Sequence, residues 1–257
     1  GDGQATFQSY LEQNRLGLRA QRIEPIVASD GSSPGLPYYE VLLGIREVDG
    51  TLRPPGDLVL AAERSGQVGV LDRWVLKTAF AWMRTHSDWL QTVQGLSLNV
   101  SGTTLADPGL SDEVHALIDY YSVDPTKVVF EVTESAAIGP MAVAEAFIHS
   151  LRERGCRFAL DDFGAGHSSF SYLKILPVDI VKIDGLFVRE IVSSSTDQAM
   201  VRSLNEIAKL FGKKTVAEFV EDEEALEVLR GLGVDYAQGF GIERPMPIEL
   251  LPDISDH

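Results

Sequence analysis

The sequence predicts an α/β fold, a modified TIM-like (βα)8 barrel with one antiparallel strand near the N-terminus. Eight short apolar runs occur along the 257 residues, amphipathic helical patterns separate most of them, and no shift in composition divides the chain. Strands that alternate with helices are typical of folds with a parallel sheet, and the length fits one large barrel. A doubly wound open sheet is the alternative.

The first two expected strands, 17–28 and 38–45, are joined by residues 29–37, which are rich in glycine, serine and proline. Such a connection favours a hairpin over a helical crossover, so these two strands are expected to be antiparallel. Residues 70–86 and 197–212 have apolar side chains at three- and four-residue spacing, as in amphipathic helices. The other expected strands occupy 96–101, 128–134, 157–162, 179–184, 215–221 and 235–241.

Composition limits the location and the partners of the chain. A formal net charge of -16 disfavours binding to a nucleic-acid polymer or an anionic membrane, although bound metal ions allow a small phosphate ligand. The sequence has no apolar run of the roughly 18 residues that a membrane span needs and no signal peptide pattern. The single cysteine, Cys156, fits a reducing compartment. We expect one cytoplasmic barrel domain over residues 1–257, with its core at about 16–250, excised from a longer multidomain protein whose other regions could anchor it to a membrane.

Polar residues interrupt seven of the apolar strands, mostly near their C-terminal ends. A single residue of this kind is ordinarily a solvated strand end, but those ends meet at one face of a barrel, where active sites lie. Four carboxylates and an asparagine at that face need cations, and oxygen ligands favour Mg²⁺, Mn²⁺ or Ca²⁺ over zinc. The seven residues are Glu40, Asn99, Glu131, Asp161, Lys182, Glu218 and Gln238.

Two adjacent carboxylates, Asp161 and Asp162, end one apolar run. Because side chains alternate along a strand, one is expected to face the barrel axis and the other the following loop. Such a pair suits two metal ions roughly 3.5–4 Å apart, which together stabilise the attacking and leaving oxygens of a displacement at phosphorus. Lys182 and Asp184 share a strand face, and an inward lysine suits orienting a water or neutralising a phosphate.

Seven short motifs follow one another along nearly the whole chain: YEVLL (39–43), LNVS (98–101), FEVTES (130–135), DDFGAGHSS (161–169), VKID (181–184), VAEFVE (216–221) and QGFGIERP (238–245). Each motif alone is weak evidence, whereas their order and spacing together are specific. The chain resembles the EAL-domain family of bacterial cyclic di-GMP phosphodiesterases, with EVL in place of the signature triplet. The resemblance implies hydrolysis of cyclic di-GMP to linear pGpG in second-messenger signalling. It also implies two divalent cations, Mg²⁺ or Mn²⁺, and inhibition by Ca²⁺.

The resemblance also implies a role for each matching residue. Glu218 matches a general base, Lys182 the lysine that orients the attacking water, and Glu134 a glutamate that holds the loop after Asp162. Asp161 matches the bridging metal ligand. The complete set of implied metal ligands is Glu40, Asn99, Glu131, Asp161, Asp162 and Glu218. The implied substrate-binding residues are Glu40, Leu42, Arg46, Asp184, Phe219, Glu221 and Gln238.

Three positions depart from the family pattern. The family places an arginine that contacts a substrate phosphate where this chain has Gly44, and Arg46 lies two residues further along the same strand face. Glu24 stands in place of a glutamine and is expected to add negative charge near the ligand. Phe219 replaces a common glycine and is expected to stack on a guanine or to pack against a neighbouring helix. The resemblance therefore implies a complete metal site and a weakened contact to the phosphate of the substrate.

The resemblance further implies a homodimer and an upstream sensor or GGDEF-type domain. The helix and loop after Asp162 would form the dimer contact, because residues 168–177 are more apolar than one short loop needs. The alternative is that these side chains only pack the outer layer of the barrel. The apolar residues concerned are Phe170, Tyr172, Leu173 and Ile175.

Two functions of different classes stay open. One is a metal-dependent phosphodiesterase, and the other is a weak or inactive receptor module that binds cyclic di-GMP or a partner protein. The complete set of matching metal ligands favours the enzyme. Enolisation by Mg²⁺ and a lysine base is a third option, which the motif resemblance disfavours and the chemistry alone does not.

Overall fold

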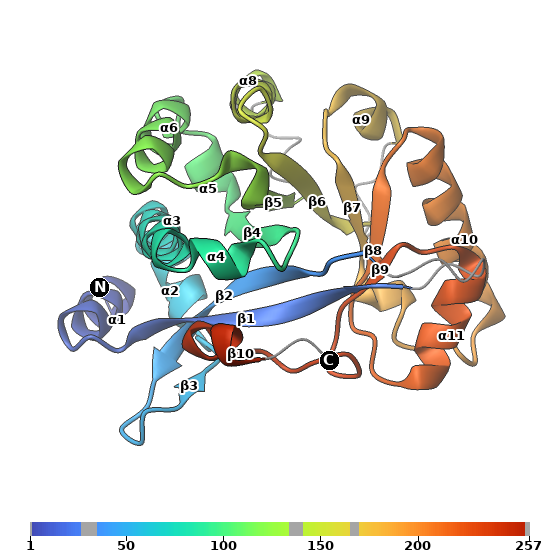
Figure 1. The fold of residues 1–257 in the computed structure, drawn as a ribbon, viewed down its shortest axis with the longest axis horizontal. Coiled ribbons are helices and arrows are strands. Elements are labelled where there is room, and N and C mark those ends of the chain that lie inside the picture. The colour runs from blue at the N-terminus through green and yellow to red at the C-terminus, as the bar shows by residue number, and fades with distance from the viewer. Residues whose placement is uncertain (1, 27–34, 134–140, 165–169, 255–257) are drawn as a thin grey trace.

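The computed structural model of this chain describes residues 2–26, 35–133, 141–164 and 170–254, and its main feature is a closed barrel of eight strands (Figure 1). Seven strands run parallel in chain order, and pairing of the first with the second closes the sheet. The predicted barrel is therefore confirmed, and the open sheet is excluded. The barrel strands are β1 (Leu16–Pro25), β2 (Tyr38–Arg46), β4 (Gly95–Val100), β5 (Val128–Thr133), β6 (Arg157–Phe163), β7 (Ile180–Ile183), β8 (Lys214–Ala217) and β9 (Tyr236–Ala237).

Strand β1 runs antiparallel to both of its barrel neighbours, β2 and β9, as predicted for the first hairpin. Leu16 pairs with Ile45 at one end of the hairpin, and Ile23 pairs with Tyr38 at the other. Two short strands, β3 (Leu52–Arg53) and β10 (Met246–Pro247), extend the sheet beyond the barrel beside β2 and β1. The reversed strand matters for function, because its N-terminal half lies beside the C-terminal half of β2.

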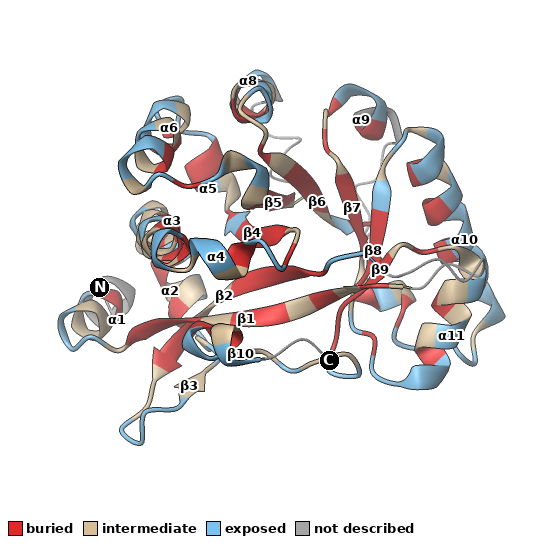
Figure 2. Ribbon diagram, viewed as in Figure 1, coloured by how far each residue is buried: buried red, intermediate tan, exposed pale blue. Residues whose placement is uncertain are grey.

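Helices surround the strands (Figure 1). Their inner faces are buried and their outer faces exposed, as the 3.6-residue period of an amphipathic helix requires (Figure 2). The predicted helices correspond to α3 and α10, whereas α1 was not predicted. The described helices are α1 (Asp2–Glu12), α2 (Leu58–Arg64), α3 (Val68–Thr85), α4 (Ser87–Leu90), α5 (Gly102–Leu105), α6 (Leu110–Tyr121), α8 (Met141–Arg152), α9 (Phe170–Ile175), α10 (Ser195–Leu210) and α11 (Glu223–Leu232), with short 3₁₀ turns at Pro125–Lys127, Gly185–Phe187 and Ile248–Asp253. Within the described ranges no helix combines the length and apolarity needed to cross a membrane.

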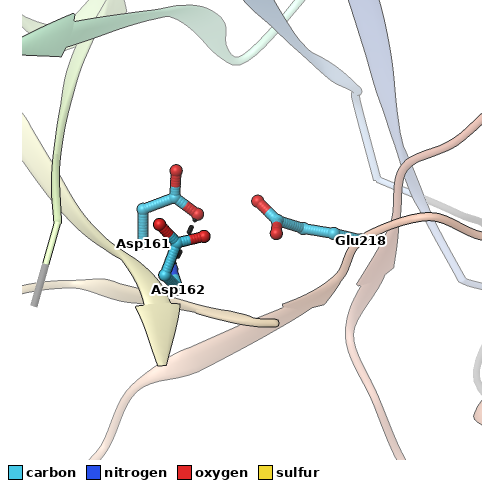
Figure 3. A group of neighbouring side chains, drawn as sticks. All are labelled: Asp161, Asp162 and Glu218. Atoms are coloured by element: carbon cyan, nitrogen blue, oxygen red, sulfur yellow. Dashed lines mark hydrogen bonds between the residues drawn. The ribbon is translucent and has the colours of Figure 1, made fainter. Parts of the chain in front are cut away.

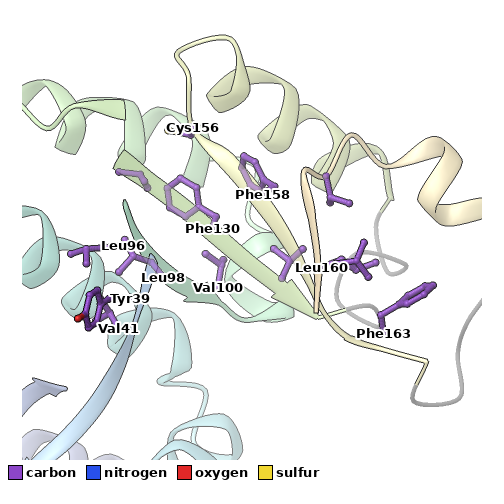
Figure 4. Close-up of a cluster of buried hydrophobic side chains, with 14 of the residues drawn as sticks. Tyr39, Val41, Leu96, Leu98, Val100, Phe130, Cys156, Phe158, Leu160 and Phe163 are labelled. Atoms are coloured by element: carbon purple, nitrogen blue, oxygen red, sulfur yellow. The ribbon is translucent and has the colours of Figure 1, made fainter. Parts of the chain in front are cut away.

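The main hydrophobic core lies between the strands and the helices (Figure 4). Phe130 of β5, Phe158 of β6 and Phe147 of α8 are at the centre of one part of it, with ring centroids 5.4 to 5.7 Å apart. Two of the three ring pairs meet edge to face, which adds to the stabilisation from burial alone. Cys156 is buried beside this core.

Strands β8 and β9 end earlier than the sequence predicted. Phe219 has a φ of 58° and Gly239 a φ of 154°, and neither value belongs to a strand. Glu218 and Gln238 therefore lie just beyond the strand ends, in backbone that is held by a hydrogen bond from the Val220 amide to the Gln238 carbonyl. This backbone forms part of one rim of the barrel.

Candidate active site

A second, smaller hydrophobic cluster fills the barrel interior and fixes the level at which polar side chains begin. It consists of Ile23, Tyr38, Val129, Ala159, Ile180, Val216 and Tyr236. Because alternate residues of a strand face the same side, the residue two positions further on also points inward. Those next positions are Gln21 on the reversed strand, then Glu40, Glu131, Asp161, Lys182, Glu218 and Gln238. One polar layer therefore lies directly above one apolar layer.

Lys182 is at the centre of this polar layer. Its Nζ lies 2.9 Å from Oε1 of Glu40, 2.9 Å from Oε1 of Glu131 and 3.4 Å from Oε1 of Glu218. Burial would lower the pKa of Lys182, but the surrounding carboxylates outweigh it and raise the pKa well above the ordinary value. The lysine is therefore a permanent buried cation that holds three acids in fixed positions.

Glu40 accepts hydrogen bonds from three neighbours. Besides Lys182, Nδ2 of Asn99 donates to its Oε2 at 3.0 Å and Nε2 of Gln238 donates to its Oε1 at 2.8 Å. Burial raises the pKa of Glu40, but Lys182 and the two amide donors more than offset it, so the net shift is downward. Glu40 is ionised and oriented, and Asn99 is fixed through it.

Glu131 has one oxygen without a partner among the described residues. Its Oε1 accepts from Ser97 Oγ at 2.7 Å and from Lys182, whereas the buried Oε2 has no hydrogen-bond donor. Burial and the neighbouring carboxylates of Glu40 and Asp161 raise its pKa. A buried carboxylate oxygen without a donor is costly, and a divalent cation is the partner that satisfies it best.

Asp161, Asp162 and Glu218 form the acidic cluster of the site. Each offers a carboxylate oxygen, and these oxygens all lie within 4.8 Å of one another (Figure 3). Burial raises the pKa of Asp162 to about 6, with Asp161 and Asp184 adding repulsion. Burial likewise raises the pKa of Glu218. Three carboxylates this close fit hard divalent cations with oxygen ligands.

The predicted alternation of Asp161 and Asp162 is wrong. The pairing of β6 with β7 shifts register between Leu160 and Phe163, and Asp162 has a left-handed φ of 55°. This bulge turns the second carboxylate back toward the first instead of to the opposite face (Figure 3). The Asp162 amide also donates to Oδ1 of Asp161 at 2.8 Å, which fixes the turn.

The acidic cluster opens into a cavity of about 620 Å³. Glu40, Leu42, Phe219, Glu221 and Gln238 line it, as do the three acids of the cluster. Phe219 is about half exposed and packs over Gly185, with the guanidinium of Arg189 4.9 Å from its ring centroid. The ring of Phe219 therefore packs against the 3₁₀ turn Gly185–Phe187 and also forms part of the cavity wall, and stacking on a guanine stays a prediction.

Three predicted site residues lie elsewhere or have other contacts. Arg46 donates to the Gly50 carbonyl at 3.1 Å and pairs with Glu249 at 3.6 Å, outside the cavity lining. Asp184 caps the 3₁₀ turn that follows β7 by accepting from the Leu186 amide at 2.8 Å. Glu134 lies outside the described residues.

Glu24 does not reach the site, which corrects the expected charge near the ligand. Its side chain lies on the opposite face of β1 from that of its neighbour Ile23, which points into the barrel. On this outer face Glu24 forms an ion pair with Arg22. The glutamine at the site is Gln21, three residues earlier, whose Oε1 accepts from Gln238 at 3.1 Å. Gln21 is a polar residue within an apolar strand, and this feature could have identified it. It was missed because site residues were expected at the C-terminal ends of strands, whereas β1 is antiparallel and brings its N-terminal half to this rim.

The sequence reasoning also missed Arg189 and Phe240, which line the cavity. Both follow the strands by several residues, in loops with no periodic pattern. Phe240 lies within the QGFGIERP motif, which was an available signal, whereas Arg189 lies in no motif.

Comparison with known proteins gives one consistent result. The chain is 37% identical over 238 residues to the cyclic di-GMP phosphodiesterase PdeB of Shewanella oneidensis and 34% identical over 242 residues to PdeF of Escherichia coli. These matches cover 93% and 94% of this chain but only 27% and 31% of the relatives, so the chain spans less than a third of their length.

A solved structure of similar fold is described as the PaMucR phosphodiesterase in complex with c-di-GMP. It shares 33% identity and a TM-score of 0.86, covering 98% of this chain and all of that one. The EAL domain model matches residues 4–245. With the barrel, the acidic cluster and these likenesses together, the chain belongs to the EAL domain family.

Proposed function

We propose that this domain hydrolyses cyclic di-GMP to linear pGpG. The observation that carries the proposal is the acidic cluster of Asp161, Asp162 and Glu218, which adjoins the Lys182 network at the floor of the cavity. Relatives of this family are named cyclic di-GMP phosphodiesterases, and a similar structure holds c-di-GMP. A cyclic dinucleotide is an anion, and an acidic site accepts it only with cations present.

Two divalent ions, Mg²⁺ or Mn²⁺, are the cofactors that we propose. Asp161, Asp162 and Glu218 would hold one ion, and Glu40, Asn99 and Glu131 with Asp161 would hold the other, at the face where Oε2 of Glu131 has no donor. When bound, such ions polarise the phosphoryl group and lower the pKa of a coordinated water. The all-oxygen ligand set fits these ions better than zinc.

The residues of the chain have separate roles in the proposed reaction. Lys182 stays charged and orients the attacking water from below. Glu218, 3.4 Å from Lys182 and on the rim, is placed to accept the proton of that water. Nε2 of Gln238 donates to Glu40 and to Oε1 of Gln21, whose own Nε2 donates to the Glu243 carbonyl, and both glutamines line the cavity. The exposed rings of Phe219 and Phe240 offer stacking surfaces for guanine bases.

We also propose that the chain works as a homodimer within a larger cytoplasmic signalling protein that carries an upstream sensor or GGDEF-type domain. Support for the larger protein comes from the much greater length of the relatives. Support for the dimer comes from Ile175 of α9, which is 53% exposed, whereas Leu173 is buried. Phe170 and Tyr172 lie among side chains that the structure does not describe.

Incubation with cyclic di-GMP and either Mg²⁺ or Mn²⁺, followed by chromatographic separation of nucleotides, tests the proposal. We expect pGpG from the wild-type protein and almost none from Asp161→Ala, whose circular dichroism spectrum should match that of the wild type. Titration calorimetry with Ca²⁺ in place of Mg²⁺ measures binding without turnover. Tight binding with no pGpG from either metal would favour the receptor function, and full activity of Asp161→Ala would contradict the site assignment.

A further inference from the structure

The paired strands β1 and β2 form one wall of the cavity, and Arg19 lies on that wall. Directly paired residues of antiparallel strands project to the same face. Gln21 pairs with Glu40, and the next pair in that direction on the same face is Arg19 with Leu42. Gln21, Glu40 and Leu42 all line the cavity. Arg19 therefore projects from the same face of the wall, about 6.8 Å along the strand from Gln21 and next to Leu42, just beyond the residues that line the cavity.

The side chain of Arg19 crosses the neighbouring strand over Gly44. A Cβ atom at position 44 would lie 3.2 Å from Cγ of Arg19 and 3.3 Å from its Cδ and Nε, so the glycine leaves the space that the arginine fills. Nε and Nη2 of Arg19 both donate to the Leu43 carbonyl, at 3.1 and 2.9 Å. The guanidinium is thus held in place across the wall.

The guanidinium of Arg19 keeps donors available. Within the described ranges its only acceptor is the Leu43 carbonyl, and Nη1 donates to nothing. Glu40 is close enough to favour its charged form against the burial that lowers its pKa. An arginine presents five N–H donors in a rigid plane, which matches a phosphate better than a single carbonyl.

Few other cations reach the cavity. Among the described residues that line it, Arg189 is the only one with a cationic side chain, and its guanidinium lies 4.9 Å from the centroid of the Phe219 ring. Lys182 lies below, between three carboxylates. A ligand with two phosphodiester groups can place only one of them at the acidic cluster. On the β1–β2 wall, the guanidinium of Arg19 would offer the second one a positive partner.

We propose that Arg19 binds a phosphate of the cyclic dinucleotide on the β1–β2 wall, and that Gly44 permits this by leaving room for its side chain. The inference rests on the proposed function. Arg19 is a substrate-binding residue supplied by the reversed strand, and it acts in place of any side chain from position 44 of β2. Arg46 shares that strand face but lies beyond Gly44 and is held by Gly50 and Glu249.

Binding of cyclic di-GMP in Ca²⁺ to matched variants tests the inference. Arg19→Met keeps the aliphatic stem over Gly44 and removes the charge, and loss of a charge-assisted contact should weaken binding about ten- to a hundredfold. Arg53→Met, an exposed arginine of β3, removes the same charge and should leave the affinity unchanged. Equal melting temperatures of the two variants would show that folding is not the cause.

Moving the arginine from position 19 to position 44 tests the inference more sharply. Gly44→Arg alone should gain little, because its Cβ would crowd Arg19, whereas the double variant Arg19→Ala with Gly44→Arg should recover most of the lost affinity. Wild-type binding by Arg19→Met, or a loss caused by Arg46→Met instead, would overturn this inference and leave the proposed function standing. A wild-type protein that neither binds nor hydrolyses cyclic di-GMP would overturn both.

Discussion

Nζ of Lys182 lies 2.9 Å from Oε1 of Glu131, and both side chains are only 1% exposed. A buried pair of this kind gains little over apolar packing, yet losing one member is costly because the other charge stays buried. The value of this pair is therefore positional. It fixes the free oxygen of Glu131 at the floor of the site.

Replacing Lys182 by Met tests that reading. The change leaves the carboxylates of Glu40, Glu131 and Glu218 without their common cation, and we expect the free energy of unfolding to fall by about 3–5 kcal/mol. Urea denaturation in EDTA measures the effect without contribution from divalent ions. The exposed Lys77→Met is the control and should stay within about 0.5 kcal/mol of wild type. An unchanged urea midpoint for Lys182→Met would contradict the buried network.

Truncation of Phe158 tests the core around β5, β6 and α8. Phe158 is fully buried and contacts the rings of Phe130 and Phe147. We expect Phe158→Ala to cost about 3–5 kcal/mol, because the lost apolar burial is joined by a cavity that the neighbours fill only in part. Tyr120→Ala, at a ring that is 72% exposed, should cost far less. Similar losses for the two variants, measured by urea denaturation, would be evidence against this core.

The thiol of Cys156 should be unreactive in the native protein. Burial raises its pKa to about 12, and only 2% of the residue is exposed. At pH 8 the thiolate fraction is then on the order of one in ten thousand, whereas an unfolded cysteine with a pKa near 8.5 is about a quarter ionised. Colour development with an aromatic disulfide reagent should therefore be slow in buffer and rapid in guanidinium. Rapid labelling of folded protein would show that the β6 end of the barrel opens.

The proposed dimer contact can be tested at Ile175. Light scattering of the wild-type protein at micromolar concentration should give twice the chain mass of 28.1 kDa. Ile175→Glu places a charge in the contact and should shift the mass toward the monomer, while Leu210→Glu on α10, which is 80% exposed, should not. A monomeric wild-type protein would favour the alternative that this segment only packs the barrel.

Much of the fold was predictable, because it follows from periodicities that each segment carries alone. Apolar runs and helical spacing located the eight strands and the main helices, and the loop at 29–37 identified the hairpin. Residue types also identified the acidic cluster. The predictions that failed were those that depended on the exact geometry of the strands. Glu24 was expected near the ligand in place of a glutamine, but the residue of β1 at the site is Gln21, because an odd-numbered shift along a strand changes the face on which a side chain lies.

The bulge after Leu160 and the path of Arg19 could not be predicted from local sequence. The bulge results from pairing with β7, and the path of Arg19 depends on a glycine in the neighbouring strand. Both are properties of register between segments that are distant along the chain. A residue-by-residue comparison of β2 alone finds a missing arginine, whereas the paired strands contain one.

Two of the four non-glycine residues with positive φ in the described chain, Asp162 and Phe219, belong to the site. A left-handed backbone costs a substituted residue about 1–2 kcal/mol, and a bulky aromatic residue is especially unfavourable there. Glycine at either position would relieve that cost, so selection for thermal robustness alone would remove both side chains. Both side chains line the cavity, so the backbone cost is concentrated at the site and not spread over the barrel. Glycine at either position should therefore raise the free energy of unfolding while removing a side chain from the cavity wall.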